Sequence, residues 1–160
     1  MKPFFLFIAM ATVALPLQAA ETGYTSSTTL PVQQHSRQVK IELEVDENEI
    51  KEYGLKISDI LSEINTRLTL GQIQIKNDIE APILVLRIKS IEQDKLVAAF
   101  VQLSFFEKAS LLRNHSLILA QTWSKAAMVG GPKEMFTKEV TDAITSMVNT
   151  FVLYYQKALS

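Results

Sequence analysis

The side chains best suited to chemistry in this 160-residue chain are few and scattered, with two histidines and no cysteine. His35 lies in a stretch rich in Ser, Thr and Gln, and His115 lies where we expect a hairpin turn. Because metal sites draw on grouped His, Cys or carboxylate ligands, the sequence predicts no metal site. Without thiols it also predicts no thiol redox chemistry.

The densest acidic cluster consists of Asp46, Glu47, Glu49 and Glu52. Oxygen-rich loops bind calcium, but this stretch lacks both the glycine and the ligand spacing of a calcium loop. Paired carboxylates can also act as acid and base on a sugar, so a small exported hydrolase using Asp46 and Glu49 stays an open alternative. We interpret the cluster as a solvated, charged turn.

Nucleophilic serine and phosphate-loop chemistry both lack their sequence patterns. Serine needs a neighbouring base, and no G-x-S-x-G turn is present. Gly130-Gly131-Pro132-Lys133 precedes an expected helix, where backbone N–H groups can bind an anion, but it has no phosphate-loop spacing. We therefore predict a plain loop-to-helix junction there, and no catalytic residues, no cofactor and no enzymatic activity.

The first twenty residues have the layout of a secretory signal peptide. Lys2 supplies a positive start, Phe4 to Leu15 form an apolar run, Pro16 breaks it, and Ala19-Ala20 offer a small-residue cut site. The run is shorter than the roughly 20 residues that a membrane-spanning helix needs. We predict cleavage near Ala19 or Ala20, with an uncleaved anchor as the alternative.

The leader sets the expected organisation and localisation of the chain. We predict a signal peptide over residues 1–20, a flexible lead-in over 21–37 and a single domain over 38–160, located in the periplasm or secreted. No cysteine lies near the cut, so we expect no lipid anchor. The chain has 16 basic and 17 acidic residues. This balance leaves no basic footprint for nucleic acid and no polybasic run for anionic membranes, and no later segment is apolar enough to span.

The hydrophobic periodicity predicts five strands and two helices. Alternation predicts a strand over Val39–Val45, and a spacing of three and four predicts a helix over Lys56–Leu70 that ends at Gly71. Further strands are expected over 72–76, 83–91, 95–106 and 116–125, followed by a terminal helix after Gly130-Gly131-Pro132. Asn114-His115-Ser116 matches a glycosylation pattern at the expected hairpin tip. The order β-α-β-β-β-β-α predicts a two-layer α+β domain, a mostly antiparallel sheet with both helices on one face.

Two adjacent aromatic residues suggest a surface for a partner. Phe105 and Phe106 follow one another in an expected strand, so their side chains point to opposite faces. One of them must therefore leave the main core face, and an uncovered apolar spot often marks a binding surface. With Trp123 on the neighbouring strand, these residues are the candidate partner surface.

The order of elements resembles small periplasmic envelope domains such as the TolB amino-terminal domain and LptE-type outer-membrane assembly proteins. The resemblance covers Val39 to Leu159, and Thr122-Trp123-Ser124 is similar to an element in small uncharacterised secreted bacterial proteins. It implies an envelope protein without catalytic residues. The lipid-bearing cysteine of the LptE type is absent, which argues against direct outer-membrane anchoring.

Together these features predict a non-catalytic periplasmic interaction module that serves cell-envelope or secretion-apparatus assembly. Its partner would be an envelope protein, docked on a sheet face or an edge strand. The alternative is a small-ligand or lipid carrier with an apolar pocket between sheet and helices. Phe105, Trp123, Met128 and Phe151 would line such a pocket.

Overall fold

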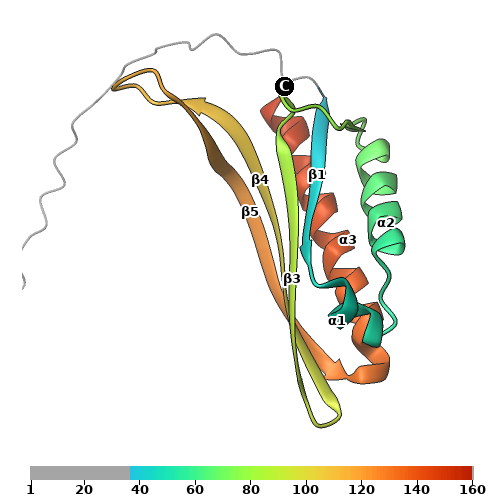
Figure 1. Cartoon of the computed structure of the whole chain (residues 1–160). Coiled ribbons are helices and arrows are strands. Elements are labelled where there is room, and N and C mark those ends of the chain that lie inside the picture. The colour runs from blue at the N-terminus through green and yellow to red at the C-terminus, as the bar shows by residue number, and fades with distance from the viewer. Residues whose placement is uncertain (1–36, 160) are drawn as a thin grey trace, which may run out of the picture. The chain divides into compact units, whose positions relative to one another are not determined.

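The computed structural model describes residues 37–159, so the predicted signal peptide, His35 and nearly all of the lead-in lie outside the described residues. Five strands and three helices follow one another in this part of the chain (Figure 1). The strands are β1 Gln38–Val45, β2 Gln74–Ile75, β3 Ile83–Gln93, β4 Leu96–Ser110 and β5 Leu117–Pro132. The helices are α1 Glu47–Glu52, α2 Ile57–Leu70 and α3 Lys133–Ala158. The predicted α+β class is confirmed.

The strands form one mixed sheet in the order β2-β1-β3-β4-β5. β3, β4 and β5 pair antiparallel as two successive hairpins, which supply most of the paired length. β1 pairs parallel with both β2 and β3, a feature that the expectation of a mostly antiparallel sheet did not include. The helical segment that follows β1 returns the chain to the end of the sheet where β1 begins, so β2 and β3 run in its direction.

Helices α2 and α3 lie on one face of the sheet, as predicted (Figure 1). The strands turn alternate side chains toward them, and on β4 the buried series runs from Val97 to Phe105. α3 contributes a buried stripe from Phe136 to Tyr155 at helical spacing. The core therefore fills a single layer between sheet and helices, and no described helix covers the opposite face.

The acidic stretch after β1 is helical, so the predicted charged turn is wrong. Asp46 caps helix α1, because its side chain accepts hydrogen bonds from the backbone N–H groups of Asn48 at 3.0 Å and Glu49 at 3.3 Å. Ile50 is buried and anchors the short helix to the core. A capping aspartate followed by acidic residues in the first turn is the usual start of a helix.

Strand β5 continues to Pro132, seven residues beyond its predicted end at Lys125. Gly131 pairs with Val97 and Gly130 pairs with Ala98, so the two glycines belong to the sheet and not to a loop. Pro132 is tolerated because it is the last residue of an edge strand and precedes the first turn of α3. The predicted loop-to-helix junction is thus replaced by a direct strand-to-helix connection.

Candidate functional site

The structure separates the three aromatic residues of the candidate partner surface. Phe105 is 1 % exposed and packs under α3, with its ring 5.0 Å from that of Phe151. Trp123 is half-buried on the same side, stacked at 6.0 Å on Tyr154. Both are therefore engaged by α3. Phe106 points the other way, is half-buried, and pairs across the sheet with Ile83.

The face of the sheet opposite the helices, here called the open face, has a charged half and an apolar half. On β1 and β3, Glu44 forms an ion pair with Arg87 at 2.5 Å, and Glu42 forms one with Lys40 at 2.8 Å. The apolar half lies mainly on β3, β4 and β5 and consists of Ile83, Val85, Ile91, Leu96, Ala98, Phe100, Phe106, Ala126 and Met128. On the same face, Ser104 and Gln102 separate Phe106 from Phe100 along β4. Apolar side chains that no described helix covers are typical of a surface that binds a partner.

Strand β5 forms one edge of the sheet and is exposed along most of its length. It has 16 residues, whereas β2, at the opposite edge, has two. Such an edge presents a row of backbone N–H and C=O groups without strand partners. Lys125 is the one charged residue in its sequence, and its Nζ donates to Thr150 Oγ1 on α3 at 2.8 Å.

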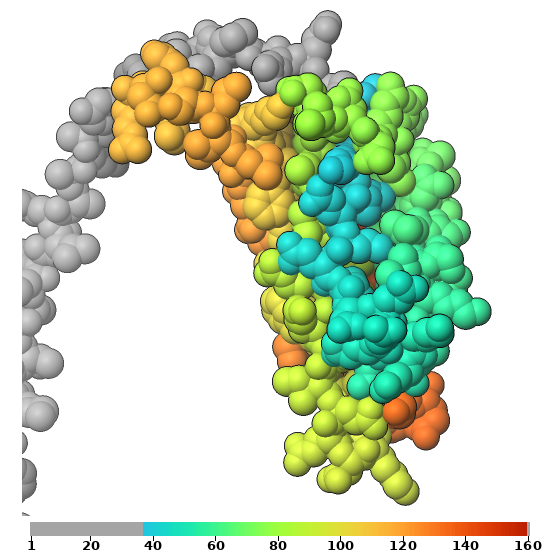
Figure 2. Space-filling view, in the orientation of Figure 1, coloured from blue at the N-terminus to red at the C-terminus, as the bar shows by residue number. Residues whose placement is uncertain are grey.

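Beyond Phe106 the β4–β5 hairpin continues without support from β3, and we call residues 107–120 the hairpin arm. β3 pairs with β4 only as far as Phe106, whereas β4 and β5 stay paired as far as Ser110 and Leu117. In Figure 2 the arm protrudes from the body formed by the sheet and helices. It ends in exposed aliphatic side chains, among them Leu112 at 82 % and Leu117 at 72 %. Chemically, the arm offers apolar contact and backbone pairing.

His115 and Asn114 sit in the turn at the end of the hairpin arm, as predicted. The N–H of His115 donates to the carbonyl of Leu111 at 2.7 Å, and the N–H of Ser116 donates to Asn114 Oδ1 at 3.2 Å. Both side chains are exposed, and the local hydrogen bonds give them a role in closing the turn. Among residues 37–159, no three His, Cys, Asp or Glu side chains gather closely enough to hold a metal ion.

The predicted lining of a carrier pocket does not surround a cavity. Phe105, Trp123 and Phe151 fill the core with ring contacts of 5.0 and 5.4 Å, and Met128 is 70 % exposed on the opposite face. Two hollows in the described residues lie elsewhere. A shallow groove of about 670 Å³ runs between β1 and α2, and a hollow of about 300 Å³ lies beside Arg37 and Gln72.

The acidic residues proposed for hydrolysis serve structural roles. Asp46 caps α1, and Glu49 accepts hydrogen bonds from both the backbone N–H, at 2.9 Å, and the hydroxyl of Ser90. Glu49 thereby ties α1 to β3. At the start of α3, the N–H of Lys133 donates to the carbonyl of Lys95.

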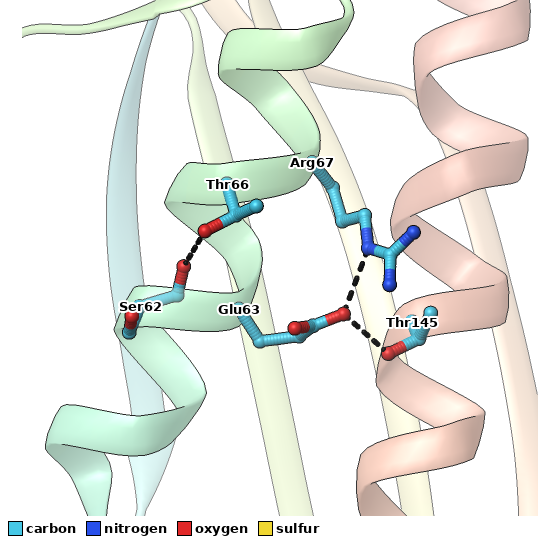
Figure 3. A network of polar contacts seen from close by, with 5 residues as sticks. All are labelled: Ser62, Glu63, Thr66, Arg67 and Thr145. Atoms are coloured by element: carbon cyan, nitrogen blue, oxygen red, sulfur yellow. Dashed lines mark hydrogen bonds and ion pairs between the residues drawn. The ribbon is translucent and has the colours of Figure 1, made fainter.

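A polar network that periodicity did not reveal joins α2 to α3 (Figure 3). Glu63 accepts hydrogen bonds from Thr145 Oγ1 on α3 and from Arg67 Nε one turn along α2, both at 2.8 Å. The Thr145 hydroxyl, followed by Arg67, lowers the pKa of the Glu63 carboxyl from its ordinary value. The sequence signal was the i,i+4 spacing of Glu63 and Arg67, but Thr145 comes from a distant part of the chain.

No family model matches the chain, and no curated protein matches it. Among solved structures, it is similar to a minor lipoprotein from Acinetobacter baumannii, at 12 % identity over 76 % of this chain and 94 % of that one, with a TM-score of 0.44. It is also similar to the PelC dodecamer from Paraburkholderia phytofirmans, at 10 % identity over 73 % of this chain and 83 % of that one, with a TM-score of 0.39. The resemblance to TolB and LptE proteins stays a prediction.

Proposed function

We propose that this chain is a non-catalytic interaction module of the bacterial periplasm that serves cell-envelope or secretion-apparatus assembly. The observation that carries the proposal is the open face, whose apolar half no described helix covers. Phe106 is half-exposed beside Ile83. When a partner removes such an apolar side chain from water, the free energy of the complex falls. The docked partner would be an envelope protein.

The charged half of the open face supports an oriented contact. Arg87 and Glu44 are paired with each other and exposed at the border of the apolar half. Charged groups at the border of an interface set orientation and association rate more than affinity. A partner would therefore bury the aliphatic and aromatic side chains of β4 and leave the β1 side at the rim.

Site-specific photo-crosslinking in living cells tests this function. A photoreactive residue at Phe106 should form a crosslink to one envelope protein, and a photoreactive residue at Leu153, which is 68 % exposed on α3, should not. Phe106→Glu should abolish copurification of that protein while leaving the circular dichroism spectrum unchanged. If the protein, expressed at its native level, is recovered alone and a photoreactive residue at Phe106 forms no crosslink, this use of the open face is ruled out.

The carrier alternative has a separate measurement. Native mass spectrometry of protein purified from its own host should show the mass of the polypeptide without a lipid or other small ligand. A ligand bound one to one would instead indicate a carrier. The groove beside Ile41 and Leu61 would then be the candidate binding site.

A further inference from the structure

The exposed edge of β5 has few of the features that keep natural edge strands from pairing. Natural edge strands are usually short, charged, bulged or interrupted by proline. Among these features β5 has a single-residue bulge at Thr122. β5 has 16 residues, its proline is the last of them, and its lysine is held against α3 by Thr150. Among the described residues, no strand pairs with this edge, so it can accept another strand along most of its length.

The sequence of β5 matches itself when it is read in the opposite direction. Residues 117–120 are aliphatic, residues 121–125 are mainly polar, and residues 126–129 are aliphatic again. In a two-fold symmetric pair of antiparallel strands, each residue meets a counterpart from the other end of the same strand. The aliphatic ends would then meet each other, and the polar middle would meet itself.

Because of a bulge in β5, apolar residues that would pair between the two copies also point to the same face of the sheet. Phe105 pairs with Trp123 and Phe106 with Gln121, so Thr122 is one extra residue on β5. With Ser124 opposite its own copy, this extra residue shifts the outer register by one. Leu119 then meets Met128 of the second copy, and both residues point to the open face.

We propose that two copies of this chain pair antiparallel through β5, about a two-fold axis at Ser124, to form one continuous sheet. The outer pairs are Leu119 with Met128 and Ile118 with Val129, repeated on both sides of the axis. Leu119 is 54 % and Met128 is 70 % exposed in the single chain, so each pair removes apolar surface from water. The inference goes beyond the proposed function, because it names a second copy as the occupant of this edge.

The expected interface is small and therefore concentration-dependent. A 16-residue strand extends roughly 50 Å at about 3.4 Å per residue. A contact of that length and roughly 10 Å in width, counted on both copies, reaches about 1,000 Å², the lower end for specific interfaces. Because the two-fold axis is perpendicular to the sheet, both open faces lie on the same side and form one larger surface.

Charge substitutions at the Leu119–Met128 pair test the register. Leu119→Glu and Met128→Lys should each raise the dimer dissociation constant at least about tenfold, because each places two charges of the same sign in the interface. The double variant should recover dimerisation, since the two charges then face each other. Leu153→Glu, at an exposed position of α3, is the matched control and should leave dimerisation unchanged. Sedimentation equilibrium over a wide concentration range gives the constants.

A cysteine at the axis provides a second, independent readout. The chain has no cysteine, so Ser124→Cys should yield a specific dimer under mild oxidation or with a short crosslinker. Ser62→Cys, exposed on α2 away from β5, is the control and should yield no covalent dimer under the same conditions. A wild-type chain that is monomeric at every concentration, or a double variant that fails to recover, would overturn the proposal. Either result would leave a heterologous crosslink from Phe106 unaffected, so the two proposals fail separately.

Discussion

At the scale of single residues, Glu63 makes the stability of the fold depend on pH. Its pKa is lowered in the folded chain, first by the Thr145 hydroxyl and then by Arg67. A lowered folded pKa means that the carboxylate stabilises the fold above the ordinary value of 4.5, and that this contribution is lost as pH falls through the folded pKa.

Glu63→Gln should therefore reduce the free energy of unfolding at neutral pH by about 1 kcal/mol, and the difference from wild type should shrink as pH falls below 4.5. Denaturant titrations between pH 7 and pH 3 measure this difference. Thr145→Val, which removes the hydroxyl that bonds to Glu63, should show the same trend. Parallel pH profiles for all three proteins would exclude this role for Glu63.

The candidate surface shows how far residue patterns lead. Adjacency of Phe105 and Phe106 was enough to predict that one ring leaves the core, because strand side chains alternate. Which ring it is, and that Trp123 stacks on Tyr154, depends on where α3 lies. The Glu63–Thr145 contact joins residues 82 positions apart, a separation at which local periodicity carries no information.

At the scale of elements, the close approach of α2 and α3 requires a glycine at the end of α2. A Cβ on Gly71 would lie 2.5 Å from Val152 Cγ1 and 3.0 Å from Cγ2. Its φ of −79° suits any residue, so the requirement comes from packing and not from backbone conformation. A side chain at this position would force Val152 or the two helices to shift.

Gly71→Ala should lower the free energy of unfolding by about 1–3 kcal/mol through overpacking. Adding Val152→Ala should restore part of the loss, because it removes the two atoms that clash. Gly131→Ala is the matched control, since nothing lies within 4 Å of the added Cβ. Thermal and urea unfolding give the three values. A loss at Gly131 equal to that at Gly71 would indicate a general cost of replacing glycine.

Element types were easier to predict than element ends and pairings. Alternation located β1, and three-four spacing located α2, because each pattern reflects one buried face. The same rule failed at Gly130-Gly131-Pro132, where residues that usually end a strand continue β5 by pairing with Val97 and Ala98. It also missed α1, which depends on the Asp46 cap and one buried side chain, Ile50, and not on a repeated stripe.

At the scale of the whole molecule, the interaction surfaces matter only in the compartment where a partner is found. None of the described helices combines the length and apolar character needed to cross a bilayer. The predicted localisation of the chain therefore depends on residues 1–20, with their positive start and short apolar run. A removed leader also sets which amino terminus precedes β1.

We expect the protein isolated from the periplasm of a bacterial host to lack residues 1–19 or 1–20. Signal peptidase prefers small residues at the cut, and Ala19 and Ala20 follow the helix-breaking Pro16. Intact-mass measurement and amino-terminal sequencing read the cut directly. Replacement of both alanines by a bulky residue should retain the leader and leave the chain with the membrane fraction. Full-length protein recovered from the cytoplasm would remove the basis for an envelope partner, while dimerisation through β5 would still be tested by the Leu119 and Met128 variants.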